Sequence, residues 1–162
     1  MRRLFLCMIL VSWYTLLKAQ YEGMEYYQEQ DPAVKVKLEQ WQDLKFGFFV
    51  HWGPYSQKGY CESWTICTED VDWIQRDTII SYDEYYRNYV NLKKTFNPVK
   101  FNPEYWADLA KEAGMKYFVF TTKHHDGFCM WDTKETDYKI TSSECPYHTA
   151  PNPDILKELF GA

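Results

Sequence analysis

Lys45-Phe-Gly-Phe-Phe-Val-His-Trp-Gly53 contains a short, nearly continuous apolar run that Gly53-Pro54 ends. Such a run, with no polar alternation, is typical of a strand that is buried on both faces, as in a parallel sheet. Met115-Lys-Tyr-Phe-Val-Phe-Thr121 has the same pattern further along the chain. The two runs therefore predict two buried strands.

A helix is predicted before the first strand. Asp31 is a good N-cap residue, and Pro32 suits the first helical position. We expect this helix to turn an apolar face toward a core, with the side chains of Val36, Leu38 and Trp41.

Three further helix-opening patterns follow the first strand. Ser81-Tyr-Asp-Glu84 is a capping box and predicts a helix to about Lys94. Asn102-Pro103-Glu104 combines an N-cap, a first-turn proline and a first-turn acid, and Gly114 is the predicted stop. Asn152-Pro153-Asp154 repeats this chemistry near residue 155. The helix after Asn102 should carry one apolar stripe, formed by Trp106, Leu109, Ala110 and Ala113.

The element order is strand, long loop over residues 54–80, helices, strand, loop and helix, which predicts an α/β fold with a parallel sheet. Ligands gather at the carboxyl ends of strands in such folds. His51 and Trp52 follow the first strand, and the pair His124-His125 follows the second. Two strands cannot close a barrel, so we expect residues 31–162 to be part of a larger domain rather than a whole one.

The histidines allow three interpretations. A metal site is disfavoured by spacing, because adjacent residues of an extended chain point to opposite faces and no H-x-H or H-x₃-H pair exists. They could also be hydrogen-bonding groups that only support loops. The third interpretation is a site that reads sugar hydroxyls, since a neutral imidazole has one donor and one acceptor. Its further members would be a hydroxyl-accepting Glu62 and stacking rings from Trp52, Trp64 and Trp131.

Charge and amino-acid composition indicate which kinds of binding partner to expect. The formal charge is −5 and no lysine or arginine cluster forms a phosphate-tracking stripe, so we expect no nucleic acid partner. Aromatic residues make up 19% of the chain, which fits either a packed core or sugar-stacking platforms.

Residues 1–19 are predicted to be a signal peptide. Arg2 and Arg3 form a basic start, Leu4 to Leu17 is an apolar run too short to span a bilayer, and Ala19 precedes the expected cut. Removal of residues 1–19 changes the formal charge from −5 to −8. Residues 20–30 are expected to form a loose mature N-terminus, and the protein to be exported (periplasmic or extracellular, or lysosomal in a eukaryote) without stable membrane insertion.

Export permits disulfides, but spacing fixes no pairing among the four cysteines of the expected mature chain. Free thiols are equally compatible with the sequence. These residues are Cys61, Cys67, Cys129 and Cys145.

Four motifs stand in the order and spacing of glycoside hydrolase family 29, the α-L-fucosidases, which this chain resembles over roughly residues 35–160. The most specific is Thr121-Thr-Lys-His-His-Asp-Gly-Phe128 after an apolar strand. The others are Trp41-x-x-x-Lys45-Phe-Gly-Phe-Phe-Val-His-Trp-Gly53, Phe101-x-x-x-Tyr105-Trp106-Ala-x-Leu-Ala110 and Ala113-Gly-Met-Lys-Tyr117.

The resemblance implies a (β/α)₈-like, TIM-type barrel of which only the first strand–helix units are present, and hydrolysis of terminal α-L-fucose from fucosylated glycans with retention. It implies that His51, His124 and His125 bind fucose hydroxyls and that no cofactor or metal is needed. The family usually has a Glu-Trp pair in the first long loop, where this chain has Glu62-Ser63-Trp64.

The same resemblance places the catalytic nucleophile and the acid/base after Ala162, so no catalytic carboxylate is expected within this chain. Asp126 is expected to brace the loop after the second strand. Two other functions remain open: a non-catalytic fucose- or carbohydrate-binding module, and another retaining barrel glycosidase.

Overall fold

The computed structural model describes residues 29–68, 74, 76 and 79–162. The predicted signal peptide and most of the predicted loose segment, residues 20–30, lie outside the described residues. The chain divides into two units, residues 1–43 and residues 44–162, and each is described by itself. No helix in the described part of the chain is long and apolar enough to cross a membrane.

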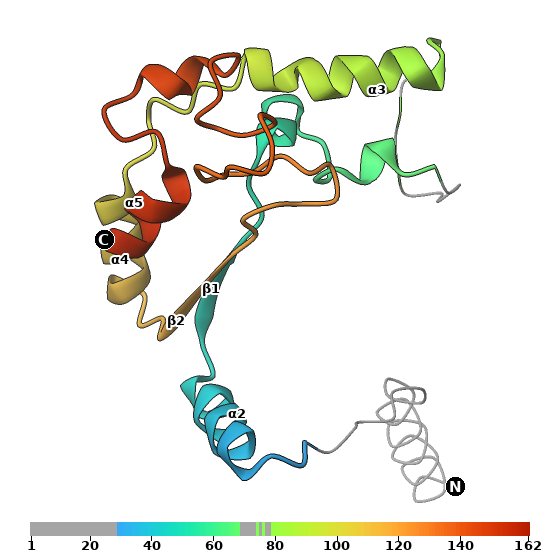
Figure 1. Cartoon of the computed structure of the whole chain (residues 1–162). Helices are drawn as coiled ribbons and strands as arrows, with labels where there is room; N and C mark the ends of the chain where they lie inside the picture. Colours follow the sequence, from blue (N-terminus) through green and yellow to red (C-terminus); the bar gives the residue numbers. More distant parts are fainter. Residues whose placement is uncertain (1–28, 69–73, 75, 77–78) are drawn as a thin grey trace, which may run out of the picture. The chain divides into compact units, whose positions relative to one another are not determined.

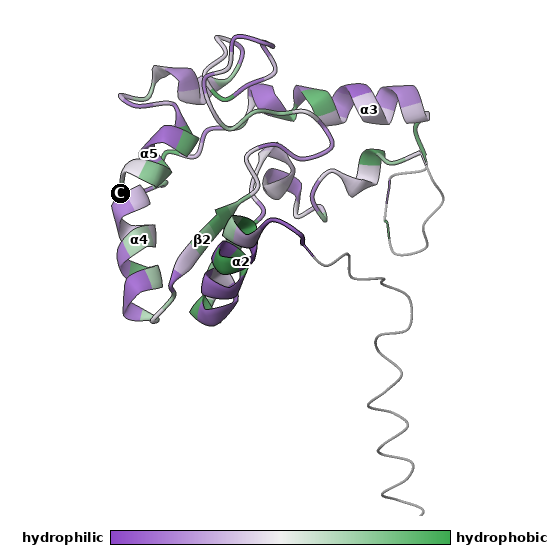
Figure 2. Cartoon of the chain, turned by 60° about the horizontal axis from the view of Figure 1, so that its bottom comes forward, coloured by the Kyte–Doolittle hydropathy of each residue, from purple (hydrophilic) through white to green (hydrophobic). Residues whose placement is uncertain are grey.

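Helix α2, Pro32–Leu44, is the described element of the first unit. Its predicted N-cap is confirmed, because Oδ1 of Asp31 accepts a hydrogen bond from the backbone N–H of Ala33 at 2.8 Å. The predicted burial of its apolar face is wrong: Val36, Leu38 and Trp41 are 52%, 43% and 52% exposed. Figure 2 shows apolar and polar residues mixed along α2. An apolar stripe is buried only where another element packs on it, and α2 has no buried residue.

Strands β1, Gly47–Val50, and β2, Tyr117–Phe120, form the predicted parallel pair, with Gly47 opposite Tyr117 and Val50 opposite Phe120. Figure 1 shows them side by side, with the loops that follow them at the same end. Gly47 is required here because a Cβ at this position would overlap the Tyr117 ring. The described residues show an α/β arrangement with two strands and no closed barrel.

The strands are not buried on both faces as predicted. Phe46 and Phe49 are 48% and 60% exposed, whereas Phe120 is buried. The reason is the size of the sheet, because each of the two described strands has only one neighbouring strand. An apolar sequence specifies a strand that suits burial, but neighbouring elements have to provide it.

The helices of the second unit begin at local capping signals. Helix α3, Tyr82–Val90, continues into a 3₁₀ turn η3, Asn91–Lys94, and Ser81 caps it by accepting from the N–H of Glu84 at 3.3 Å. Helix α4, Pro103–Glu112, is capped by Asn102, which accepts from Tyr105 at 2.8 Å. These caps are confirmed, and so is the stop at Gly114, which has φ 78°.

Two helix details differ from prediction. Helix α5, Ile155–Gly161, is capped by Asp154 rather than Asn152, because Asp154 Oδ1 is the acceptor for the N–H of Lys157 at 2.9 Å. The apolar stripe of α4 is only partly covered: Trp106 is half-buried, while Leu109 is 49% exposed. Short 3₁₀ turns complete the described elements, η1 at Pro54–Lys58, η2 at Trp64–Ile66 and η4 at Pro146–Thr149.

The main hydrophobic core lies largely in the irregular chain that follows β2. Its most deeply buried members include Ile140 and Met130, with 0% and 1% exposure. The other members are Phe96, Phe120, Phe128, Cys145, Tyr147, Ile155 and Leu159. A second, smaller cluster joins Tyr55, Tyr89 and Leu92. The four cysteines whose pairing the sequence left open are all free thiols, two of them buried.

Candidate functional site

Three loop segments bring His51, Glu62 and His124 together at the carboxyl ends of β1 and β2. The His51 and His124 rings lie 5.7 Å apart between centroids. Nδ1 of His51 lies 3.8 Å from Oε1 of Glu62. One ligand atom from each of the three side chains falls within 4.8 Å of the others. The strand-end position predicted these histidines to be neighbours, and the long loop after β1 adds the carboxylate.

His125 joins the same group through a tight turn. The N–H of Gly127 donates to the carbonyl of His124 at 3.0 Å, and Gly127 has φ 84°. The two neighbouring imidazoles are therefore 4.9 Å apart and both contact the Trp64 ring, at 5.9 and 5.2 Å. The prediction that adjacent histidines point to opposite faces is wrong because it assumed an extended chain.

Ser63 is a site residue that sequence reasoning missed. Its side chain is 2% exposed, and its Oγ lies 2.5 Å from Nδ1 of His124. This hydrogen bond holds the orientation of the His124 ring at its Nδ1 atom. Burial, and then the neighbouring His125, lower the pKa of His124, which keeps its imidazole neutral near pH 7. A lone serine in a loop carries no periodic signal, although its place between Glu62 and Trp64 pointed to this segment.

Glu62 has a backbone conformation that non-glycine residues rarely adopt, with φ 42°. Such a residue costs about 1–3 kcal/mol and is held in place by its surroundings. Ser63 is buried directly after it, and the Cys61 thiol donates to Glu62 Oε2 at 3.4 Å. The turn thereby directs the carboxylate toward His51, and strain of this kind is common at functional sites.

Asp126 braces the loop after β2, as predicted. Its Oδ1 accepts from the N–H of Phe128 at 3.0 Å, and its Oδ2 accepts from the hydroxyl of Tyr89 at 2.8 Å. Burial raises the pKa of Asp126, and these two donors partly oppose that rise. Tyr89 belongs to α3, so this hydrogen bond ties the histidine-bearing turn to a helix.

The three tryptophans predicted for stacking have different environments. Trp64 contacts both adjacent histidines. Trp52 instead packs against Phe101 and Trp106, both 5.3 Å between centroids, beside the main core. Trp131 is half-buried, and among the described residues no ring contact links it to the histidines. The structure thus brings Trp64 into the candidate site and places Trp52 in the core packing.

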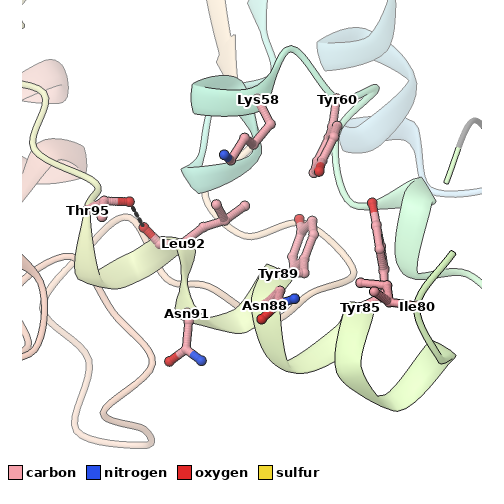
Figure 3. A pocket seen from close by; sticks show the side chains of 9 residues that line it. All are labelled: Lys58, Tyr60, Ile80, Tyr85, Asn88, Tyr89, Asn91, Leu92 and Thr95. Carbon is pink, nitrogen blue, oxygen red and sulfur yellow. Dashed lines mark hydrogen bonds between the residues drawn. The ribbon is translucent and has the colours of Figure 1, made fainter. Parts of the chain in front are cut away.

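Two hollows lie in the second unit of the chain. One, of about 350 Å³, is lined by Trp64 and His125 of the candidate site, together with Ser63, Ile66, Cys67 and Tyr86. A larger hollow, of about 420 Å³, contains none of the seven predicted site residues. Figure 3 shows Tyr85 and Tyr89 of α3 near Tyr60 in the wall of this larger hollow, which Lys58 also lines. Of the three histidines only His125 lines the smaller hollow, so this hollow lies next to the histidine group, and we place the candidate site at the group itself.

Comparison with known proteins shows the family to which this chain belongs. The model of the α-L-fucosidase family matches residues 15–162, and the chain therefore belongs to the α-L-fucosidase family. It is 37% identical over 130 residues to the human tissue α-L-fucosidase, covering 75% of this chain and 26% of that protein. It is 34% identical over 123 residues to a putative α-L-fucosidase of Caenorhabditis elegans, covering 74% of this chain and 24% of that protein.

Solved structures agree with this assignment. A GH29 α-L-fucosidase from Bacteroides thetaiotaomicron superposes with a TM-score of 0.59 at 33% identity, covering 88% of this chain and 29% of that one. A bacterial fucosidase bound to an iminocyclitol inhibitor superposes with a TM-score of 0.57 at 31% identity, with 88% and 30% coverage. The chain spans about a quarter of the length of the sequence relatives described above.

Proposed function

We propose that the protein hydrolyses terminal α-L-fucose from fucosylated glycans, with retention, as part of a TIM-type barrel enzyme. The observation that carries this proposal is the convergence of His51, His124 and His125 with Glu62 beside the Trp64 ring, in a chain that belongs to the α-L-fucosidase family.

The chemistry of these groups suits a sugar. A neutral imidazole donates one hydrogen bond and accepts another, and a carboxylate accepts from up to two hydroxyls. Because His124 keeps its neutral form and Ser63 occupies its Nδ1, its Nε2 is left to make one hydrogen bond to a hydroxyl-rich ligand. The Trp64 ring adds an apolar face next to these polar groups, which matches the mixed surface of a deoxy sugar.

Retaining hydrolysis requires two carboxyl groups about 5–5.5 Å apart on either side of the scissile bond. We assign neither role to a residue of this chain, and Asp126 serves as a loop brace. The proposal therefore places the nucleophile and the acid/base after Ala162, and the 162-residue chain alone should not turn over an aryl α-L-fucoside.

The decisive experiment measures kcat/KM and the melting temperature side by side for H51A, H124A and H125A in the full-length natural protein. A buried partner left unpaired costs on the order of 1–3 kcal/mol, so each change should lower kcat/KM by roughly tenfold to more than a hundredfold. His148, whose Nδ1 contacts the carbonyl of Cys145, lies outside the group and provides the matched control H148A. Near-wild-type kcat/KM in all three variants would refute the sugar-binding role.

We also propose that the protein is exported after cleavage near Ala19. The basic, apolar and small-residue order of residues 1–19 supports this. N-terminal sequencing of the secreted protein tests it, and an intact Met1 on the folded, soluble product would contradict it.

A further inference from the structure

We propose that His51, Glu62 and His124 also bind a divalent transition-metal ion of the zinc type, which excludes the sugar from the site. The three residues come from separate segments, after β1, within the long loop and after β2, so their spacing in the sequence gave no sign of a metal site. In the structure, one ligand atom from each lies within 4.8 Å of the other two. The geometry, and not a sequence motif, points to this site.

The donor set matches zinc chemistry. Two imidazole nitrogens and one carboxylate oxygen are ligands that Zn²⁺ accepts at about 2.0–2.2 Å, with a fourth position left for water. Harder ions such as Mg²⁺ prefer all-oxygen sites, so this set selects against them.

The three ligand atoms are close enough together to bind one ion. Nδ1 of His51 and Oε1 of Glu62 lie 3.8 Å apart. Ligand atoms bound to one zinc ion lie roughly 3.3 Å apart, as follows from tetrahedral bonds of about 2 Å. Only small side-chain adjustments are therefore needed. The His51 and Glu62 side chains are 36% and 25% exposed, so an ion can reach them.

A neighbouring side chain provides the kind of hydrogen bond that orients metal-binding imidazoles. Such a ring is commonly oriented by a hydrogen bond at its other nitrogen, which fixes the tautomer. Ser63 makes a contact of this kind with His124 and is itself buried. The His51 ring contacts the Phe49 ring at 5.0 Å and lies 5.7 Å from the His124 ring.

Zinc binding itself does not depend on fucosidase activity and is tested with the metal alone, whereas exclusion of the sugar rests on the proposed function. Isothermal titration of ZnCl₂ into the full-length natural protein, free of affinity tags, should show one site whose affinity falls at least about tenfold in H51A and in E62Q. Neither residue is buried, so these variants should fold, and their melting temperatures check this. H124A is avoided because it also removes the Ser63 contact.

Two controls separate this site from adventitious zinc binding. H148A removes a histidine outside the group and should bind Zn²⁺ as the wild type does. MgCl₂ should give no binding at this site. Unchanged zinc affinity in H51A and E62Q, or no zinc binding by the wild type, would overturn the proposal.

L-fucose and zinc should compete for this site. Saturating L-fucose should weaken apparent zinc affinity, because both ligands need the same three side chains. Undiminished zinc affinity in saturating fucose would overturn the shared occupancy. A protein that binds zinc with the expected variant pattern but hydrolyses no fucoside would refute the proposed function and leave the metal site standing.

Discussion

The loops that follow the two strands are better buried than the strands themselves. Ile140 and Met130 in the irregular chain after β2 are 0% and 1% exposed, whereas Phe49 in β1 is 60% exposed. Strands usually form the interior of an α/β fold and loops its surface. Here the chain that carries the candidate site has its own hydrophobic support, so the site geometry depends more on the loop core than on further cover for the sheet.

The largest expected effect is a difference in stability loss between a substitution in the loop core and a substitution in strand β1. In the 162-residue chain, Ile140→Ala should lower the free energy of unfolding by about 2–5 kcal/mol, because it opens a cavity in a fully buried position. Phe49→Ala should lower it by less than about 1 kcal/mol, since most of that ring already contacts solvent. Urea denaturation measures both values. Equal losses would show that the sheet and the loop core are equally well packed in solution.

A second test addresses the link between the loop and helix α3. Tyr89→Phe removes the donor to the half-buried Asp126 and should cost on the order of 1–3 kcal/mol. Burial raises the pKa of Asp126, and a group with a raised pKa in the folded state loses stabilisation as the pH rises. The Tyr89 hydroxyl opposes this rise because it stabilises the charged carboxylate, so the cost of Tyr89→Phe should be greater at pH 7 than at pH 3, where the carboxyl group is protonated.

Tyr85 supplies the matched control for this experiment. It is also buried on α3, but its hydroxyl has no hydrogen-bond partner among the described residues. Tyr85→Phe should leave stability nearly unchanged or raise it. A loss in Tyr85→Phe as large as that in Tyr89→Phe would contradict the role given to the Asp126 contact.

A third test asks whether the loop core positions the site or only stabilises it. Ser63→Ala in the full-length protein should lower kcat/KM about threefold to tenfold, as expected for the loss of one hydrogen bond of about 1 kcal/mol. Nitrogen NMR of the His124 ring should show a changed tautomer balance. Ser142→Ala, at another buried serine, should affect only stability. Unchanged kcat/KM and an unchanged His124 spectrum in Ser63→Ala would reject the positioning role.

The parts of the fold that depend on local chemistry were predictable from the sequence. Asp31, Ser81 and Asn102 cap helices because a cap needs only a side-chain oxygen and the N–H groups two or three residues later. The parallel pairing of β1 and β2 follows from two apolar runs separated by helices.

Features that depend on distant neighbours were not predictable. The exposure of Phe49 depends on what covers the sheet, and the core position of Trp52 depends on Phe101 and Trp106. The contact between Ser63 and His124 joins residues 61 positions apart. Burial and side-chain pairing of this kind arise from tertiary packing, which a single sequence does not specify residue by residue.

The smallest expected effect is the pH dependence that His124 adds to stability. The folded protein lowers the pKa of His124 below its ordinary value of 6.5, first by burial and then by the charge of His125. Below pH 6.5 the unfolded chain takes up a proton that the folded chain does not, so the contribution of His124 to stability is complete above that pH and declines as the pH falls toward its folded pKa. His124→Gln removes this titration, whereas His148→Ala retains it. Urea denaturation between pH 7.5 and 5 should show the steeper acid-side loss in wild type and His148→Ala, because the candidate site holds this imidazole neutral; equal slopes in His124→Gln would mean that the ring is as freely protonated in the folded loop as in the unfolded chain.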